Sequence, residues 1–375
     1  MRFSMPFAEK EEARQELCRL ALAKGANRRE LCRRFGLQPR ILYKWLARYR
    51  QAGAAGLPDR SRRPHRSPER TAPEMEAAVL AVRRDNPMWG GRKIATSLSR
   101  QGLSPPSPST ITAILQRHGV AMVAPGHKAW KRFEHAEPNV LWQMDFKSDV
   151  PLARGRLHPL TVVDDHSRYA VILHAADNQR HQTVQNAVQA AFECYGLPDA
   201  ILTDNGSPWG STAQQTLTKF GVWLIEHGVA PWHSPPLHPQ SHGKNERFNR
   251  TLKAELLERR TFDDLHQAQR AFDAWRHRYN HHRPHDAIGL AVPADRYRPS
   301  RRTFTLTVEP FDYGPDAVIR SVDAAANISF QSRRWKASKA LVGKHVAIRP
   351  TDHDGLFDIV FRHVTIRSIN FHQIS

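Results

Sequence analysis

Apolar residues in the first 55 positions recur at the spacing of three short helices. The first covers residues 8–24 and the second residues 28–35, and the turn Gly36-Leu37-Gln38 leads to a third that begins at Pro39. Proline is favoured at the first position of a helix, where its missing N–H costs nothing. Two short helices joined by a glycine-containing turn are typical of a helix-turn-helix unit. The third helix is expected to carry basic side chains every four residues on one exposed face: Arg40, Lys44 and Arg48.

A second helical unit follows a basic linker. The linker, 56–73, is rich in proline and arginine, so it is either a flexible tether or an extended arm that follows phosphates or enters a minor groove. Beyond it, Ser107 or Ser109 can cap a helix that ends at Gly119. Two tandem units would contact a longer DNA site than one. We expect the helices of the second unit at 74–86, 89–102 and 107–119.

From residue 139 the pattern changes to runs rich in valine, isoleucine, leucine and tyrosine, which are typical of strands. Amphipathic helices alternate with the later strands, in the order βββαβαβα. This order predicts an α/β core in which helices flank a mixed sheet. The strands are expected at 139–147, 156–167, 168–177, 199–206 and 222–228, and the helices at 181–196, at 212–221 and after the Pro-rich loop that ends at Gly243.

The C-terminal region shows short strands separated by turn residues, which predicts a small β-barrel. Such a domain either binds DNA or only stabilises the chain, and three basic residues favour DNA: Arg333, Arg334 and Lys336. The expected fold is therefore multidomain α+β, with N-terminal tandem helix-turn-helix units, a central α/β core and the C-terminal barrel. We divide the chain into 1–55, 56–73, 74–125, 136–298 and 303–375.

Positive charge is concentrated in the first third of the chain. The formal net charge is +20 and the pI is near 10.5. Residues 1–135 hold 27 Lys and Arg against 11 Asp and Glu, residues 136–300 hold 18 of each, and residues 301–375 hold 11 against 7. This charge indicates a polyanionic partner, nucleic acid before anionic membrane. No stretch approaches the roughly 20 apolar residues of a membrane span, so we expect a cytoplasmic or nucleoid-associated protein.

Cysteine and histidine give no strong case for a disulfide or a zinc site. Cys18, Cys32 and Cys194 form no closely spaced pair. No Cys-x2-Cys motif is present to partner any of the 21 histidines. His281 and His282 are adjacent, but they lack a second ligand pair at the spacing of a metal site.

Three carboxylates fall on central elements of the predicted core. Asp145 lies in an apolar strand, where a lone aspartate is costly without a partner. Asp204 ends the fourth strand, and Glu246 starts the helix after the Pro-rich loop. Carboxylates gathered at one edge of a sheet repel one another, and divalent cations remove that penalty. Oxygen ligands select Mg²⁺ or Mn²⁺, and two such ions support an in-line displacement at phosphorus.

The adjacent pair Asp164 and Asp165 offers rival carboxylates. Neighbouring side chains on a strand point to opposite faces of the sheet, so at most one of the two could face the same site. We expect the pair to end the second strand and to cap the following turn.

The segments WQMDF, TDNGSP and HGKNERFNRTLKAE resemble the three acidic motifs of DDE transposases with a retroviral-integrase-type core. GLPDRSRRPHRSP, NPMWGGRKI and YNHHRPHDAIG are similar to blocks of bacterial insertion-sequence transposases of that superfamily, so the resemblance covers nearly the whole chain. It implies a ribonuclease-H-like core, Mg²⁺ dependence, cutting and joining at terminal inverted repeats, and a homo-oligomer assembled on paired DNA ends. The catalytic, metal-binding positions that match are Asp145, Asp204 and Glu246. The 41 residues between Asp204 and Glu246 exceed the spacing usual in such cores.

Basic residues behind Glu246 are candidates for holding the DNA end. Arg250 and Lys253 lie four and seven residues after it, on one helical face. Integrase-type cores carry basic residues at equivalent offsets, which favours phosphate contact over a merely solvated face. The opposite face is an apolar stripe that anchors the helix: Phe248, Leu252 and Leu256. The full set of expected DNA contacts is Arg40, Lys44, Arg48, Arg62, Arg63, Arg92, Lys93, Lys244, Arg250 and Lys253.

The expected function is that of a transposase that binds its element's ends and joins their 3′-OH groups to double-stranded target DNA. Two other functions stay open: a DNA-binding regulator without chemistry, and a ribonuclease-H-like nuclease that cleaves but does not join. The complete acidic triad disfavours the regulator. A tyrosine recombinase would leave the triad unexplained.

Overall fold

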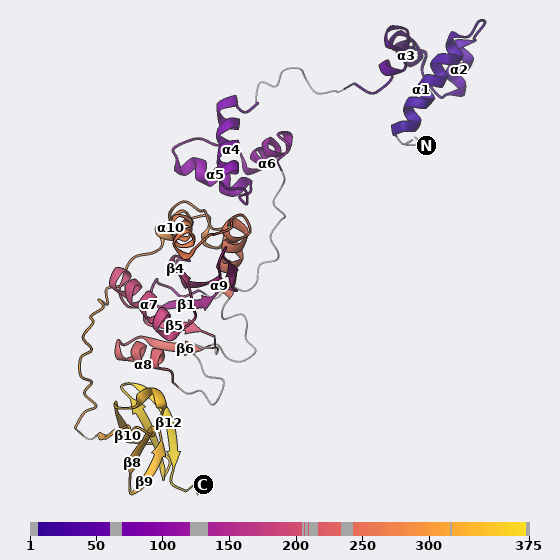
Figure 1. Cartoon of the computed structure of the whole chain (residues 1–375). Coiled ribbons are helices and arrows are strands. Elements are labelled where there is room, and N and C mark those ends of the chain that lie inside the picture. Colours follow the sequence, from indigo (N-terminus) through magenta and orange to yellow (C-terminus); the bar gives the residue numbers. More distant parts are fainter. Residues whose placement is uncertain are drawn as a thin grey trace. The chain divides into compact units, whose positions relative to one another are not determined.

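The computed structural model divides the chain into two compact units, Met1–Arg70 and Thr71–Ser375 (Figure 1). It describes residues 7–60, 70–120, 134–204, 206, 209, 217–233, 243–315 and 317–372. No helix within these ranges is long and apolar enough to cross a membrane.

The first unit is a three-helix cluster, as the sequence predicted. Its helices are α1 (Phe7–Leu22), α2 (Arg28–Arg34) and α3 (Pro39–Ala52), followed by a 3₁₀ turn, η1 (Gly53–Gly56). Asn27 caps α2 by accepting a hydrogen bond from the N–H of Glu30 (3.2 Å), which satisfies one of the free donors at the helix start. The apolar faces of the three helices meet in a core that includes Leu17, Cys18, Leu42, Trp45 and Leu46.

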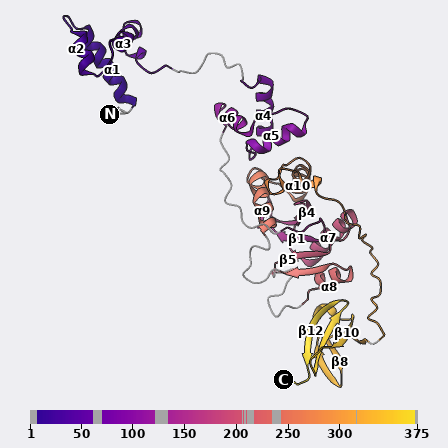
Figure 2. The same cartoon turned by 180° about the vertical axis from the view of Figure 1, so that it is seen from behind.

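A second three-helix cluster begins the other unit, and Figure 2 shows it from behind. The predicted cap is present, because the Ser107 hydroxyl accepts a hydrogen bond from the N–H of Thr110 (3.2 Å). Gly91 allows two of the helices to pack closely, since a Cβ at this position would lie 2.3 Å from the carbonyl oxygen of Pro108. The helices are α4 (Pro73–Asp85), α5 (Gly91–Arg100) and α6 (Pro108–Arg117).

A mixed six-stranded sheet forms the centre of the second unit, which confirms the predicted α/β core. The strand order is β2-β3-β1-β5-β6, and β4 pairs with β3. β3 is antiparallel to β1 and β4, whereas β1, β5 and β6 are parallel to one another in turn. The strands are β1 (Leu141–Phe146), β2 (Val150–Pro151), β3 (Arg156–Asp164), β4 (Ala170–Ala176), β5 (Ala200–Thr203) and β6 (Ala230–His233).

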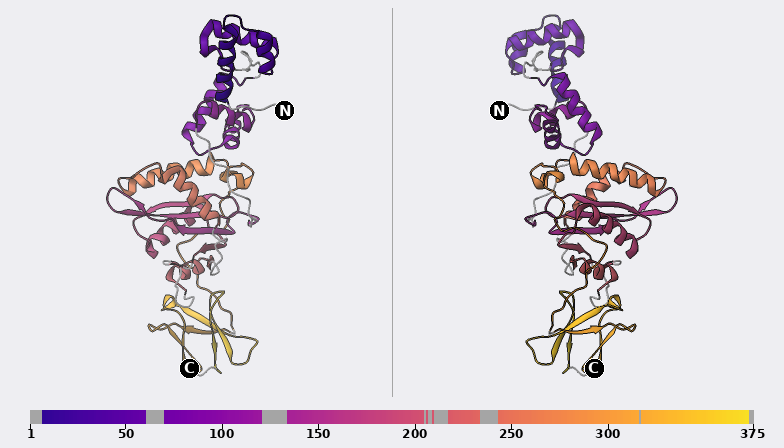
Figure 3. Two further views of the ribbon diagram at one scale, coloured as in Figure 1. Left: turned by 90° about the vertical axis from the view of Figure 1, so that its right-hand side faces the viewer. Right: turned by 90° about the vertical axis from the view of Figure 1, so that its left-hand side faces the viewer.

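Helices cover both faces of this sheet (Figures 1 and 3). On one face, Trp142 and Met144 of β1 share a core with α7 (His181–Tyr195) and α8 (Lys219–Glu226). On the other face, residues of β3 and β4 share a second core with two further helices and the π-helical turn between them. These are α9 (Gly243–Leu252), η3 (Lys253–Leu257) and α10 (Leu265–His281). Alternation along β1 therefore turns Gln143 and Asp145 toward the α9 side.

The prediction of a strand at 222–228 was wrong, because this segment lies mostly in α8, and the strand β6 follows it. The Thr218 hydroxyl caps α8 by accepting a hydrogen bond from the N–H of Gly221 (3.1 Å). The helix buries apolar side chains on two sides, with Phe220 and Leu224 against the sheet and Val222 and Ile225 against the C-terminal region. A helix that is apolar all round has no helical period in its sequence. The helix predicted at 212–221 lies partly outside the described residues.

The C-terminal region is all-β, as predicted, but its described strands form open antiparallel sheets and not the predicted closed barrel. The described strands form a four-stranded antiparallel sheet, β12-β11-β10-β7, and a separate two-stranded sheet, β8-β9, and these pairings do not close into a ring. Both sheets contribute to one core. The strands are β7 (Val318–Ser321), β8 (Asn327–Phe330), β9 (Arg333–Lys336), β10 (His345–Pro350), β11 (Leu356–Phe361) and β12 (Val364–Asn370), and the 3₁₀ turns of this unit are η4 (Asp286–Ile288), η5 (Pro293–Asp295) and η6 (Lys339–Leu341).

Candidate catalytic site

The parallel pairing of β1 and β5 brings two of the predicted carboxylates to one place. Leu141 pairs with Ala200, and Gln143 pairs with Leu202. Continuing this register by two residues places Asp145 opposite Asp204, on strands about 4.8 Å apart. The two carboxylates are close enough for the charge of Asp204 to act on Asp145.

Asp145 is partly buried, and its surroundings oppose its negative charge. Burial and then the nearby charge of Asp204, with a smaller contribution from Glu246, raise the pKa of Asp145 to about 6 from its ordinary value of 3.8. A hydrogen bond from the N–H of Phe146 acts in the opposite direction. The side-chain amide of Asn249, on α9, donates to Asp145 Oδ2 (3.2 Å). The three predicted carboxylates are therefore electrostatically coupled, and this coupling contributes to the raised pKa of Asp145.

Asp204 follows β5 directly and is exposed. Its Oδ1 accepts hydrogen bonds from the N–H of Gly206 (3.0 Å) and from the indole N–H of Trp209. Trp209 is itself buried and stacks on Phe146, with the ring centroids 5.3 Å apart. The residue after Asp145 on β1 thus supports the ring that orients Asp204.

Glu246 is the fourth residue of α9 and is exposed. The predicted apolar stripe of this helix is buried in the core beneath the sheet: Phe248, Leu252 and Leu256. Arg250 is exposed, as expected. The helix widens into a π turn at Lys253, whose ammonium lies 3.5 Å from the carboxylate of Glu258, and both side chains are more than half exposed. Inserting a π turn shifts the helical register after Leu252.

Asp164 and Asp165 are both buried; Asp164 caps the turn after β3 as predicted, whereas Asp165 contacts other elements. Asp164 accepts hydrogen bonds from the N–H groups of Ser167 and Asn139, both at 2.7 Å, and so holds the turn after β3. Asp165 forms an ion pair with Lys244 and accepts a hydrogen bond from the side-chain amide of Gln143 (2.8 Å).

Two of the three predicted DNA contacts on α3, Lys44 and Arg48, lie over one aromatic ring. Arg40 and Lys44 are exposed and Arg48 is half-buried. Lys44 Nζ lies 4.9 Å and the Arg48 guanidinium 5.0 Å from the ring centroid of Trp45, and Arg14 lies 4.0 Å from it. Cation–π contact holds these side chains over a buried ring. The other two predicted contacts of this region lie outside the described residues: Arg62 and Arg63.

Arg92 and Lys93, at the start of α5, contact the catalytic core. Arg92 Nη2 lies 2.8 Å from one carboxylate oxygen of Asp286, and Lys93 Nζ lies 3.5 Å from the other. Burial, and then the charge of Arg283, lower the pKa of Lys93 to about 8. Arg100, at the end of α5, makes two hydrogen bonds to Asp295 (2.8 and 3.0 Å). Lys93 therefore contacts the core, and Lys244 pairs with Asp165, which leaves little of either side chain for contact with DNA. Arg92 keeps much of its side chain exposed.

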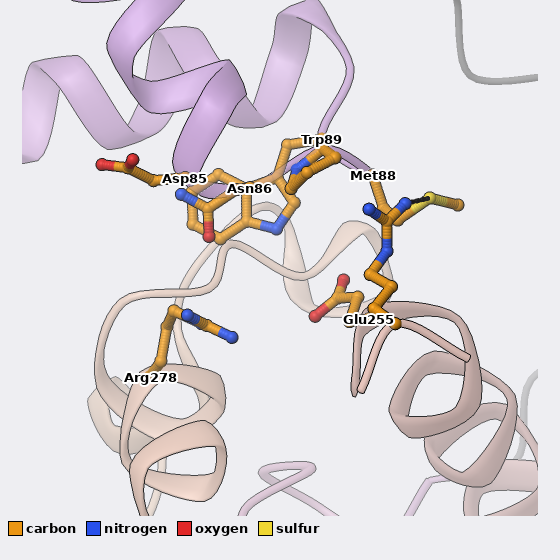
Figure 4. A pocket seen from close by; sticks show the side chains of 8 residues that line it. Asp85, Asn86, Met88, Trp89, Glu255 and Arg278 are labelled. Carbon is orange, nitrogen blue, oxygen red and sulfur yellow. Dashed lines mark hydrogen bonds between the residues drawn. The ribbon is translucent and has the colours of Figure 1, made fainter. Parts of the chain in front are cut away.

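A small pocket lies where the α4–α5 loop meets the core (Figure 4). Its volume of about 20 Å³ gives room for one or two water molecules. Its lining residues are Asp85, Asn86, Pro87, Met88, Trp89, Glu255, Arg259 and Arg278. This pocket is too small to hold a substrate.

The donor set of the candidate site suits a hard divalent cation. All three predicted ligands are carboxylates, and oxygen donors select Mg²⁺ or Mn²⁺. The raised pKa of Asp145 is a second sign, because a cation would remove the repulsion that causes part of it. Across the described ranges no three His, Cys, Asp or Glu side chains are already close enough to hold a metal ion. The carboxylates would therefore have to draw closer to bind one.

Sequence reasoning missed the amides and the indole that hold these carboxylates. Asn249 and Trp209 each donate to one of the acids, and Asn245 and Gln143 bond to each other beside them. The one available signal is that Asn245 and Asn249 are spaced four residues apart around Glu246, which puts them on a common face of α9.

Comparison with protein families matches most of the chain to known domains. Two models described as "Integrase core domain" match residues 135–239 and 227–293. A helix-turn-helix domain matches residues 14–65, and a homeodomain-like domain matches residues 41–115. The C-terminal domain of the IS481 family transposases matches residues 317–374.

Relatives of the chain are proteins of mobile elements. The chain is 32% identical to the insertion element IS476 39.2 kDa protein of Xanthomonas euvesicatoria, over 47% of this chain and 49% of that protein. It is 26% identical to the IS407 31.7 kDa protein of Burkholderia multivorans (60% and 82%) and 24% identical to the transposase for transposon Tn552 of Staphylococcus aureus (60% and 51%). The chain thus spans about half the length of the first of these relatives.

Likeness to solved structures is weak. A chain of the simian T-cell lymphotropic virus intasome aligns at 14% identity, with a TM-score of 0.41, over 78% of this chain and 96% of that one. The HTLV-2 integrase catalytic core in complex with magnesium aligns at 18% identity, with a TM-score of 0.33, over 43% and 97%. The family matches carry more: they comprise helix-turn-helix domains, an integrase core domain and the C-terminal domain of the IS481 family transposases, so the chain is similar to insertion-sequence transposases.

Proposed function

We propose that this protein is a DNA transposase that binds the terminal inverted repeats of its element, cleaves the DNA there and joins the 3′-OH ends to target DNA. The observation that carries the proposal is the electrostatic coupling of three carboxylates, one on β1, one directly after β5 and one on α9. Burial and the charges of Asp204 and Glu246 raise the pKa of Asp145 to about 6. A carboxylate whose ionisation is opposed in this way by its surroundings is characteristic of a functional site.

Asp145, Asp204 and Glu246 would hold two Mg²⁺ ions, with Mn²⁺ as a substitute. Bound there, the ions would supply the Lewis-acid stabilisation that an in-line displacement at phosphorus needs. The protein supports these ligands with neutral donors: Asn249 holds Asp145 and Trp209 holds Asp204. Because these donors carry no charge, they orient the carboxylates without competing for the cation.

The proposed chemistry consists of two in-line displacements at phosphorus, a hydrolysis followed by a transesterification. In cleavage, a water oxygen bonds to the phosphorus at the element end, and the bond to the 3′ oxygen breaks to leave a 3′-OH. In strand transfer, that 3′-OH oxygen bonds to a phosphorus of the target, and the target's own 3′ oxygen leaves. Each step makes one P–O bond and breaks one. No covalent enzyme intermediate is required, which fits a site built of carboxylates.

The two helical clusters would bind the element ends, and the exposed Arg250 would contact a phosphate beside the carboxylates. The division of labour would follow the expected domains, 1–55, 74–125, 136–298 and 303–375, with 56–73 as the linker. The active form would be a homo-oligomer assembled on paired DNA ends, and it would act in the bacterial cytoplasm on the nucleoid. The family matches support these assignments.

The test is an assay of nicking and strand transfer on DNA that carries the inverted repeats flanking the coding region. We expect both products with Mg²⁺ or Mn²⁺ and neither with EDTA. Glu246→Gln should abolish both products and leave DNA binding within about twofold of the wild type. Unchanged activity of this variant would show that the site is wrongly assigned. Nicking without joining would indicate a nuclease, and metal-independent binding without nicking would indicate a regulator.

A further inference from the structure

The start of α9 is bonded directly to β1. The side-chain oxygen of Gln143 accepts a hydrogen bond from the N–H of Asn245 (3.2 Å), which is one of the free donors at the helix start. In return, the side-chain amide of Asn245 donates to the carbonyl oxygen of Gln143 (3.1 Å). Gln143 lies two residues before Asp145 on the same face of the strand, and Asn245 immediately precedes Glu246. The residues that hold α9 are thus neighbours of two catalytic carboxylates.

An ion pair and a hydroxyl extend this link to β3. Lys244 pairs with Asp165, which follows β3, and Asp165 also accepts from the side chain of Gln143. The Thr161 hydroxyl of β3 lies 3.0 Å from both the carbonyl oxygen of Asp145 and the side-chain oxygen of Asn245. A single network therefore contains the backbone of Asp145 and the residue before Glu246.

The network is buried and almost fully paired. Gln143 is 2% exposed, Asp165 1%, and Asn245 and Thr161 0%. Buried polar groups are costly to separate once their partners are present, because each would be left unpaired. Asp145 enters the network only through its backbone carbonyl, and none of the three proposed metal-binding carboxylates takes part, so the bonds of the network do not depend on a cation.

We propose that Asn245, together with Gln143 and Asp165, is a positioning device that holds the start of α9, and with it Glu246, at a fixed place beside Asp145 before metal or DNA binds. This inference rests on the proposed function for what Glu246 does, but the fixation itself concerns the free protein. Metal binding then needs only adjustment of side chains, and the helix does not have to form or dock. Supporting groups of this kind typically contribute 10–100-fold to metal affinity or activity.

A matched control exists on α10. Asn280 is also buried, and its side chain likewise bonds a strand backbone, accepting from the N–H of Ala170 (2.8 Å) and donating to its carbonyl oxygen (3.1 Å). Asn280→Ala and Asn245→Ala therefore remove comparable buried hydrogen bonds between a helix and the same sheet. Asn280 belongs to neither the carboxylate site nor the network described above.

The first measurement is hydrogen exchange of the full-length protein in EDTA and in Mg²⁺. We expect the amides of residues 243–248 to be protected equally in both conditions. Asn245→Ala should speed their exchange at least about tenfold, and Asn280→Ala should not. Protection that appears only after Mg²⁺ is added would overturn the inference while leaving the proposed function intact.

The second measurement is the Mg²⁺ concentration that gives half-maximal cleavage. Asn245→Ala should raise it about tenfold, whereas Asn280→Ala should leave it unchanged. Equal shifts in both variants would reduce the role of Asn245 to general stability and overturn the inference. If Asn245→Ala fails to fold, Thr161→Val removes one hydroxyl from the network and should shift the midpoint in the same direction by a smaller factor. A wild-type protein that never cleaves would refute the proposed function, and the exchange result would still decide the fixation.

Discussion

The ionised form of Asp145 should make the metal-free protein less stable than a variant without that charge. A pKa raised from 3.8 to about 6 corresponds to about 3 kcal/mol of unfavourable ionisation in the folded state. Because the folded pKa exceeds the unfolded one, this carboxyl favours folding most at low pH. That advantage is lost as the pH rises from about 4 through 6. At pH 7.5 in EDTA, Asp145→Asn should therefore increase the free energy of unfolding by up to about 3 kcal/mol.

The pH dependence distinguishes this mechanism from a general packing effect. At pH 5 the wild-type carboxyl is still largely protonated in the folded state, so the advantage of Asp145→Asn should fall to roughly half. The assay is hydrogen exchange of peptides from β1 and β5 at increasing urea, which reports on unfolding of the core alone. Asp149→Asn is the control. Hydrogen bonds and charges from Arg156 and His158 outweigh burial and lower the pKa of Asp149, so this variant should not stabilise the protein.

Two results would refute the reasoning. One is an Asp145→Asn variant that is no more stable than the wild type at pH 7.5 in EDTA. The other is a stability difference that does not shrink at pH 5. Mg²⁺ provides a further check, because it should stabilise the wild type by binding the folded state and should stabilise Asp145→Asn much less. The variant should also be inactive, which would make it an example of stability gained at the expense of a functional site.

Three further predictions follow from single contacts. Trp209→Phe keeps the aromatic stack but removes the indole donor to Asp204, so we expect about tenfold lower turnover in the cleavage assay with little change in unfolding; a loss confined to stability would contradict this. Asp165→Asn removes the carboxylate that pairs with the partly buried ammonium of Lys244 and should cost roughly 1–3 kcal/mol, measured by urea unfolding; a neutral variant would show that the pair is dispensable. Ile225→Ala should cost about 2–5 kcal/mol by leaving a cavity, and a loss below 1 kcal/mol would show that α8 is loosely packed.

Local signals predicted most of the secondary structure. Pro39 and Ser107 mark helix starts by mechanisms that need only neighbouring residues, namely a fixed backbone angle and a cap. The apolar period of α9 predicted its buried stripe, and the order βββαβαβα predicted the mixed sheet. The exception was 222–228, which is apolar on both sides because it lies between two cores. A sequence with no polar face gives no period by which to distinguish helix from strand.

The sequence predicted the candidate carboxylates but not the groups that support them. The motif resemblance pointed to Asp145, Asp204 and Glu246, and the structure couples them electrostatically. The contacts of Asn245 and Asn249 depend on which strand lies beneath α9. The helical sequence around these two asparagines does not indicate which strand that is. The burial of Lys93 likewise depends on docking of α5 against the core. Its sequence neighbourhood is that of an ordinary solvated lysine.

Helix α8 belongs to two hydrophobic cores at once, and this limits how the chain can be cut or recombined. Its Phe220 and Leu224 support the sheet that carries Asp204, while Val222 and Ile225 are covered by the C-terminal strands. Lys344 of the C-terminal region also pairs with Glu226 at the end of the helix. A fragment ending before β7 would expose an apolar stripe on a wall of the catalytic core. The C-terminal region therefore cannot be replaced independently of α8. A chimaera that takes this region from a related protein would have to take α8 from the same protein.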